Sequence, residues 1–353
     1  MWPGILKIQS TYLPLYTFDG LFMTNSEFDV VGIGNAIVDV LARTEDTFLE
    51  DNGLSKGAMT IIDTENAESL YAKMGPAIEV SGGSAANTIA GLSALGGKGA
   101  FVGKVCDDQL GGVFTHDIHA IGVHFDTPSK GVETPTARSF IFVTPDAERT
   151  MQTFLGACVE LGPDDIDPEL ISKSAVTYLE GYLWDPPKAK EAFLKAAQTA
   201  DNAGRAVSLS LSDPFCVDRH RDEFLDLVTN HVNILFANEE EIKSLYQVDS
   251  FDEALQQVRG HCDIAALTRG VNGSVIVASE DVHVVDAEKV DQVVDTTGAG
   301  DAYAAGFLYG YAHGKDLHVC ARLGGIAAAE IISHYGARPE ADLAELAADT
   351  LGQ

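Results

Sequence analysis

The stretch Asp-Thr-Thr-Gly-Ala-Gly-Asp, residues 295–301, is followed by a largely apolar run at residues 302–311. This order predicts a glycine turn that leads into a buried helix. Small residues at Gly298, Ala299 and Gly300 let successive backbone N–H groups turn toward one point, and the start of a helix carries a partial positive charge. The turn is therefore predicted to be an anion hole.

The last residue of this stretch, Asp301, is expected in the first turn of the helix, where the helix dipole favours an ionised carboxylate. From there it would reach a hydroxyl that approaches an anion bound at the turn, as a general base does. A base beside a phosphate cradle suggests phosphoryl transfer. An ordinary glycine turn with Asp301 as a simple first-turn acid explains the stretch equally well on local grounds.

The rest of the chain alternates between short apolar runs and segments with helical periodicity. Such alternation is typical of a mostly parallel sheet that helices cover on both faces, so the fold class is predicted to be α/β. We expect strands at residues 28–33, 100–103, 175–179, 206–211, 234–237 and 264–268, and helices at 84–95, 111–121, 188–202, 219–228, 239–246 and 251–260.

Two parts of the chain break this alternation. Strands are predicted at residues 59–62, 139–144 and 150–155, and a turn at 145–149 joins the last two directly, which favours a hairpin in a small separate sheet. Such a sheet would act as a lid that excludes water from a reacting phosphoryl group. An extension at the edge of the main sheet is the alternative.

No Pro/Ser-rich linker separates two units, so one domain is predicted over residues 25–340, with the lid inserted as two segments at about 40–63 and 134–156. Residues 341–353 are expected to be a C-terminal tail. Residues 1–24 are aromatic and irregular and lack the pattern of a signal peptide. We expect them to be a disordered extension or the product of a start codon set too early.

Composition limits the partners. The formal net charge of −30 favours a soluble protein and argues against a nucleic-acid or anionic membrane surface. No segment reaches the roughly 20 apolar residues that span a bilayer. The five cysteines are scattered and include no C-x-x-C pair, so we expect reduced thiols in a cytoplasmic protein that acts on a small molecule.

Two polar clusters follow or precede predicted elements near the start of the chain. Asn35 and Asp39 lie just after the first strand, at the carboxyl end where α/β proteins bind ligands, and an Asp there can accept hydrogen bonds from two vicinal hydroxyls. Gly82 and Gly83 precede a helix that carries Asn87, and paired glycines allow a ligand to approach the backbone. A turn-stabilising Asp and a flexible turn remain the structural alternatives.

Two further clusters lie in the second half. Asn238 and Glu241 have the spacing of a helix capping box, and the same oxygens suit Mg²⁺ waters and phosphate. Thr268 and Gly270 end a strand where a nucleotide could be contacted, and a surface turn is the alternative. For Asn238 and Glu241, the capping role and the metal–phosphate role can hold at once.

Taken together, the order and spacing of these motifs resemble the ribokinase-like carbohydrate kinase family, and its adenosine kinase branch most closely, from residue 28 to about 339. The most specific matches are Gly-Gly-x-x-x-Asn at 82–87, Asn-x-x-Glu at 238–241 and Asp-Thr-x-Gly-Ala-Gly-Asp at 295–301. The resemblance implies a three-layer α/β fold with a mostly parallel central sheet and a small β-sheet lid. It also implies ATP and magnesium as cofactors, and a monomer or homodimer.

The resemblance further implies roles for single residues. Asp301 would deprotonate the acceptor hydroxyl while the amides of Gly298, Ala299 and Gly300 hold the transferred phosphoryl group. The other implied roles are metal–phosphate binding for Asn238 and Glu241, sugar binding for Asn35, Asp39, Gly82, Gly83 and Asn87, nucleotide binding for Thr268 and Gly270, and binding of a monovalent cation such as K⁺ for Asp295 and Thr297 with backbone oxygens near 331–336.

The acceptor implied by the resemblance is adenosine. Asn35 with Asp39 four residues later, and the segment 211–215, resemble adenosine kinases, and Arg149 at the lid tip matches an arginine of that branch that would move onto the phosphates. The expected reaction is ATP-dependent phosphorylation of the 5′-hydroxyl of adenosine to AMP. A sugar kinase acting on ribose, fructose or a related sugar is the alternative, and a non-catalytic nucleoside or sugar sensor is another.

Overall fold

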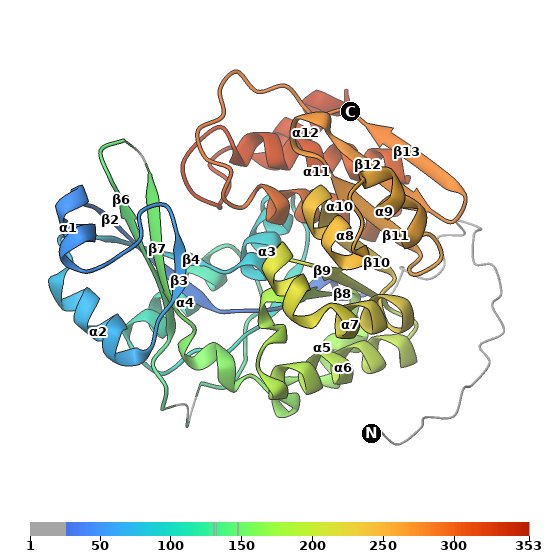
Figure 1. Ribbon diagram of the computed structural model, residues 1–353. Coiled ribbons are helices and arrows are strands. Elements are labelled where there is room, and N and C mark those ends of the chain that lie inside the picture. Colours follow the sequence, from blue (N-terminus) through green and yellow to red (C-terminus); the bar gives the residue numbers. More distant parts are fainter. Residues whose placement is uncertain (1–25, 130, 132, 147, 353) are drawn as a thin grey trace.

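The computed structural model describes residues 26–129, 131, 133–146 and 148–352. The described chain forms an eight-stranded sheet and a separate five-stranded sheet beside it (Figure 1). The predicted α/β class and the small separate sheet are thus confirmed, and an edge extension of the main sheet is excluded. The predicted N-terminal extension lies outside the described residues.

The large sheet has the strand order β13-β12-β11-β10-β9-β8-β1-β5. The strands from β5 to β11 pair in parallel, and β12 and β13 add an antiparallel hairpin at one edge. Apolar runs such as β1 are buried because helices cover both faces. The bounds are β1 Phe28–Ile33, β5 Gly99–Val102, β8 Ser174–Glu180, β9 Ala206–Ser210, β10 Ile234–Asn238, β11 Ile264–Thr268, β12 Ser274–Ala278 and β13 Asp281–Val285.

Helices form the outer layers (Figure 1). One layer holds α3 (Ser84–Ala94), α10 (Ala299–Ala312) and α11 (Leu317–Ile331), with α12 (Leu343–Leu351) packed on α11 in place of the expected tail. The other holds α5 (Pro168–Lys173), α6 (Pro187–Asn202), α7 (Pro214–Asn230), α8 (Glu239–Tyr246) and α9 (Phe251–Val258). None of the described helices is long and apolar enough to cross a membrane.

The small sheet, which we call the lid, has the order β3-β7-β6-β2-β4. Helices α1 (Asp46–Asp51) and α2 (Thr64–Lys73) lie beside it, and α4 (Gln109–Ala120) packs near β4. The sequence predicted β3 and the hairpin β6–β7, and the structure adds β2 and β4 to them. The bounds are β2 Ile37–Arg43, β3 Met59–Ile61, β4 Ile78–Gly82, β6 Ala137–Val143 and β7 Arg149–Phe154.

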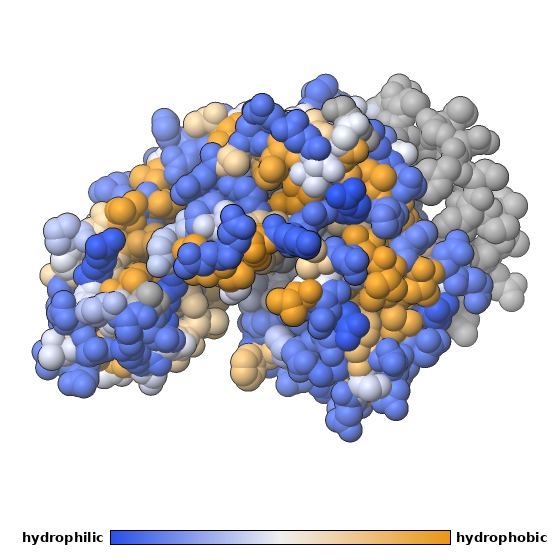
Figure 2. All heavy atoms as spheres, turned by 90° about the horizontal axis from the view of Figure 1, so that it is seen from above, coloured by the Kyte–Doolittle hydropathy of each residue, from blue (hydrophilic) through white to orange (hydrophobic). Residues whose placement is uncertain are grey.

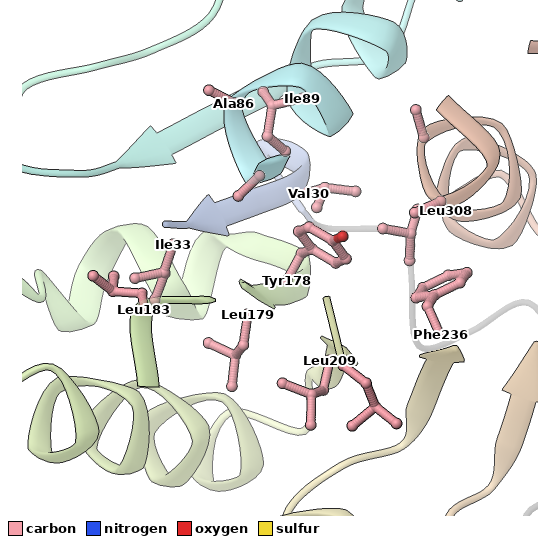
Figure 3. Close-up of a cluster of buried hydrophobic side chains, with 14 of the residues drawn as sticks. Val30, Ile33, Ala86, Ile89, Tyr178, Leu179, Leu183, Leu209, Phe236 and Leu308 are labelled. Carbon is pink, nitrogen blue, oxygen red and sulfur yellow. The ribbon is translucent and has the colours of Figure 1, made fainter. Parts of the chain in front are cut away.

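Part of the hydrophobic core lies between α3 and the large sheet, and there α3 packs closely on β1. Figure 3 shows Tyr178 of β8 near Val30 of β1, with Ile89 of α3 and Leu308 of α10 on the same side of the sheet. Gly32 lies beside Tyr178 in register, and a Cβ there would approach Ile89 Cγ1 to 2.7 Å. The missing side chain therefore lets α3 lie directly on β1, which positions the start of α3 at the carboxyl edge of the sheet.

Candidate active site

The predicted base, Asp301, lies between the N-terminal ends of two helices. It is in the first turn of α10, and its Oδ1 accepts a hydrogen bond of 2.6 Å from Ser84 Oγ at the start of α3. Its Oδ2 accepts one of 3.1 Å from Asn87 Nδ2. Asp301 and Asn87, which the sequence analysis assigned to separate roles, are in direct contact, and the sequence analysis did not identify Ser84. Both donors are uncharged, so the carboxylate keeps its charge and its capacity to accept a proton.

The environment of Asp301 makes it a stronger base than an exposed aspartate. Burial raises its pKa, while the hydrogen bonds from Ser84 and Asn87 and the charge of Arg338 lower it, and the result lies above the ordinary value. Burial thus opposes the helix dipole that the sequence argument relied on. A raised pKa suits a residue that must take a proton from an alcohol.

Gly298 has the backbone conformation that the predicted turn requires. It is the N-cap residue of α10 with φ of 79°, in the left-handed region that favours glycine. A Cβ at this position would lie 2.5 Å from the Cβ of Ala337. The turn is therefore held tightly against the loop that follows α11.

The helix begins earlier than the sequence predicted, because Ala299 and Gly300 already lie in its first turn. The amide of Ala299 donates to the carbonyl of Thr296 at 3.2 Å. The amides of Gly300 and Asp301 lie where no preceding helical carbonyl reaches them. We therefore expect these two amides to contribute most to the predicted anion hole.

Across the site, the half-buried Asp39 of β2 lies against the glycine pair that precedes α3. A Cβ at Gly82 would lie 2.5 Å from Asp39 Oδ2, and one at Gly83, whose φ is 95°, would lie 2.1 Å from the carbonyl oxygen of Asn35. Both glycines are thus required by neighbouring protein atoms. Burial raises the pKa of Asp39 to about 7, against the lowering effect of Arg338 and Arg149.

A buried carboxylate that the sequence analysis missed lies beneath this region. Glu180, at the end of β8, accepts hydrogen bonds from Asn35 Nδ2 at 2.6 Å, the Asn35 amide at 3.3 Å and the Ala85 amide at 2.8 Å. Burial raises its pKa to about 7 although these hydrogen bonds lower it. Its only sequence signal was a charged residue ending an apolar strand. Glu180 ties Asn35 to the start of α3.

Arg338 was also missed. It lies in the loop after α11, and its Nε donates to Asn87 Oδ1 at 3.0 Å. Burial lowers its pKa to about 10, against the raising effect of Asp39, Asp117 and Asp301. A positive charge therefore lies among the carboxylates of the site.

The expected nucleotide side is assembled at the neighbouring strand ends. Asn238 and Thr268 are paired in register at the ends of β10 and β11. Gly270 follows in a short 3-10 helix with φ of 55°. Arg269 between them is held by Glu239 at 3.0 Å. The sheet therefore brings these predicted residues to one edge.

Asn238 and Glu241 form the capping box that their spacing predicted. Asn238 Oδ1 accepts from the Glu241 amide at 2.9 Å, and Glu241 Oε2 accepts from the Asn238 amide at 2.9 Å. Burial, together with the charges of Asp213 and Asp301, raises the pKa of Glu241 to about 7, against the lowering effect of the hydrogen bond from the Asn238 amide. A buried carboxylate near other carboxylates is a site that a divalent cation would stabilise, and oxygen donors are those Mg²⁺ prefers. That Asn238 and Glu241 hold Mg²⁺ stays a prediction, since the described residues contain no group of three or more His, Cys, Asp or Glu side chains that could hold a metal ion.

The lid reaches the predicted cation residues through Arg149. Its Nη2 lies 2.8 Å from Asp295 Oδ2, and its guanidinium lies over the ring of Tyr335. Asp295 Oδ1 accepts from Thr297 Oγ1 at 2.8 Å, and Oδ2 accepts from the Gly336 amide at 3.0 Å. Burial raises the pKa of Asp295, but these hydrogen bonds and Arg149 bring it below its ordinary value. Asp295, Thr297 and the 331–336 segment thus lie together, and the guanidinium of Arg149 from the lid contacts Asp295.

The lid face that carries Asp39 also carries a row of apolar side chains, which we call the apolar row. It runs across all five strands in register: Ile78, Leu41, Ile141, Met151 and Met59. Ile78 is 68% exposed and Met59 is 51% exposed. Leu41 is two residues from Asp39 on β2, so both point to one face. Figure 2 shows the hollow between the lid and the body. The sequence analysis did not identify this row.

Comparison with known proteins identifies the class. Residues 62–343 match the model of the pfkB family of carbohydrate kinases, and the chain belongs to this family. It is a phosphotransferase with an alcohol group as acceptor. Kinases of this family use ATP and Mg²⁺.

Two solved structures are similar over almost their whole length. A probable sugar kinase from Rhizobium etli CFN 42 is 54% identical with a TM-score of 0.85, over 93% of this chain and 99% of that one. The adenosine kinase from Sinorhizobium meliloti is 53% identical with a TM-score of 0.85, over 92% of this chain and 100% of that one. An uncharacterized sugar kinase from Archaeoglobus fulgidus is 31% identical over 70% of this chain and 96% of its own length.

Proposed function

We propose that the protein transfers the γ-phosphoryl group of ATP to the 5′-hydroxyl of adenosine, giving AMP and releasing ADP, as a purine-salvage enzyme of the cytoplasm. The observation that carries the proposal is the apolar row on the lid face that carries Asp39, with exposed side chains at Ile78 and Met59. A nucleoside needs both a polar grip for its sugar and an apolar surface for its base. The similarity to the adenosine kinase from Sinorhizobium meliloti supports this assignment.

In the proposed reaction Asp301 accepts the proton of the 5′-hydroxyl as that oxygen attacks the phosphoryl group in line. Ser84 and Asn87 hold the carboxylate in place through hydrogen bonds of 2.6 and 3.1 Å, so little reorganisation is needed in the transition state. The amides of Gly300 and Asp301 would stabilise the charge on the transferred group. Asp39 would accept hydrogen bonds from the ribose hydroxyls.

Asn238 and Glu241 are the residues that would hold Mg²⁺, with Glu241 acting through water. When bound, the ion would neutralise charge on the phosphate oxygens. Thr268 and Gly270 would contact the nucleotide from the next strand end. When ATP binds, Arg149 would leave its partner Asp295 and pair with a phosphate oxygen, because a guanidinium forms charged hydrogen bonds with carboxylates and phosphates alike. A monovalent cation would then bind at Asp295 and Thr297.

A sugar kinase is the second candidate. It is favoured by the names of the Rhizobium and Archaeoglobus relatives. Phosphorylation of ribose or fructose would use the same base and anion hole.

Initial rates with adenosine, inosine, guanosine, ribose and fructose, measured side by side with ATP and Mg²⁺, test the proposal. We expect the highest kcat/KM with adenosine. A higher kcat/KM with ribose or fructose would replace adenosine by a sugar. Tight purine binding without ATP consumption for any acceptor would make the protein a sensor.

A further inference from the structure

Arg338 extends from a loop that is anchored at two points of the site. Two residues before it, the amide of Gly336 donates to Asp295 Oδ2 at 3.0 Å. One residue before it, Ala337 lies so close to Gly298 that a Cβ at Gly298 would be 2.5 Å from the Ala337 Cβ. The backbone that carries Arg338 is therefore fixed against the anion-hole turn.

The guanidinium of Arg338 is oriented by Asn87. Its Nε donates to Asn87 Oδ1 at 3.0 Å, and the Nδ2 of the same amide donates to Asp301 Oδ2 at 3.1 Å. An amide has one accepting and one donating end, so these two contacts fix which end faces which partner. The planar guanidinium is thereby held in one plane beside the base.

One donor of this guanidinium has no partner. Nη2 is shielded from solvent and donates no hydrogen bond to any of the residues that the structure describes. Buried donors are nearly always satisfied in folded proteins, and an unsatisfied one indicates a role or a missing ligand. The carboxylates whose charges act on Arg338 are Asp39, Asp117 and Asp301, and of these Asp39 and Asp301 belong to the two sides of the proposed acceptor site. The unpaired donor therefore lies where the acceptor's sugar would lie.

We propose that Arg338 is an acceptor-binding residue whose Nη2 donates a hydrogen bond to a hydroxyl of the acceptor's sugar. This inference rests on the proposed function, because it takes adenosine as the acceptor. Asp39 accepts from the sugar hydroxyls and Arg338 donates to one of them, so a hydroxyl is recognised both as donor and as acceptor. Such paired recognition selects against acceptors that lack the hydroxyl, because without it the buried polar groups of Asp39 and Arg338 are left unpaired.

The test measures binding by titration calorimetry, without ATP, for adenosine and its 2′-deoxy, 3′-deoxy and 5′-deoxy analogues. The proteins are wild type, Arg338→Met and Arg338→Lys. The matched control is Arg221→Met in α7, an arginine whose partners are Asp218 and the carbonyl of Ser244. Thermal unfolding of each variant shows that it is folded.

We expect Arg338→Met to weaken adenosine binding by about tenfold or more, as loss of a charged hydrogen bond does. For one deoxy analogue the substitution should cost clearly less, because that analogue already lacks the partner of Nη2. Arg338→Lys should recover only part of the affinity, since it keeps the charge without the planar donors. The control should bind all four ligands as wild type does.

The inference is overturned if Arg338→Met binds adenosine as wild type does, or if it loses the same factor with all four ligands. Full recovery by Arg338→Lys would also overturn it, because charge alone would then suffice. Failure of the proposed function appears separately, as wild-type protein that neither binds nor phosphorylates adenosine. If wild type instead phosphorylates ribose, the same comparison is made with ribose and 2-deoxyribose.

Discussion

Ser84 and Asp301 are 217 positions apart in the chain, yet Ser84 Oγ donates to Asp301 Oδ1 at 2.6 Å. The contact exists because α3 and α10 pack closely side by side. Gly91 allows this approach, since a Cβ there would lie 2.9 Å from the Cβ of Ala305 on α10. The two helix N-termini then meet at the carboxyl edge of the sheet. The side chain of Asp301 is therefore held by helix packing as well as by its own turn.

Asp301→Asn is expected to lower kcat by about 10²- to 10⁴-fold, the contribution of a positioned general base. Adenosine binding should change little, because asparagine keeps the shape of the side chain. Steady-state kinetics and calorimetry measure the two effects. Asp281→Asn, at the exposed start of β13, is the control. A variant that retains wild-type kcat would show that Asp301 isn't the base.

Ser84→Ala is expected to shift the acidic limb of the kcat/KM pH profile to higher pH. The hydrogen bond from Ser84 lowers the pKa of Asp301, so its removal raises that pKa and leaves less ionised base at low pH. The loss of activity should be larger at pH 6 than at pH 8. Ser93→Ala, near the other end of α3, should leave the profile in place. An unshifted limb in Ser84→Ala would contradict the assignment.

Glu180→Gln is expected to change how stability depends on pH. Burial raises the pKa of Glu180 from 4.5 to about 7, so between these values the folded protein keeps a proton that the unfolded chain has lost. Wild-type stability from this group therefore falls as pH rises through this window, by up to about 1.4 kcal/mol per pH unit.

Urea unfolding between pH 5 and pH 8 measures this effect. Gln at position 180 cannot titrate, so the variant's deficit relative to wild type should shrink as the pH rises. At low pH the variant should be less stable, because its amide presents N–H groups to the donors of Asn35 and Ala85. Glu345→Gln, at an exposed position of α12, should give a constant difference. A deficit that is constant for Glu180→Gln would contradict the raised pKa.

Arg149→Ala is expected to make activity depend more strongly on K⁺. Arg149 compensates the charge of Asp295 at 2.8 Å, and its removal leaves that charge for a monovalent cation to balance. Turnover is compared in KCl and in choline chloride of equal ionic strength. The stimulation by KCl should exceed that of wild type by about twofold or more. Equal stimulation of both proteins would show that Arg149 and the cation act independently.

Local sequence patterns predicted the helices and strands whose limits are marked by residues within the element or next to it. The limits of β1, α8 and β11 agree with the predicted residues 28–33, 239–246 and 264–268, because an apolar run or a capping box marks each of them. Strands β2 and β4 were missed. Each is half exposed and owes its place to partners in other parts of the chain, and single-chain patterns do not show such pairing.

The sequence by itself determined the family, the order of its motifs and the prediction of Asp301 as the base, because a glycine turn before an apolar helix is a local feature with a local chemical meaning. Only the tertiary structure decided that Ser84, Glu180 and Arg338 belong to the site. Their side chains reach the site through helix packing, strand register and a loop that is distant in sequence. The spacing of residues along the chain does not give such distances. The same reason applies to the apolar row, which exists only once five strands are aligned.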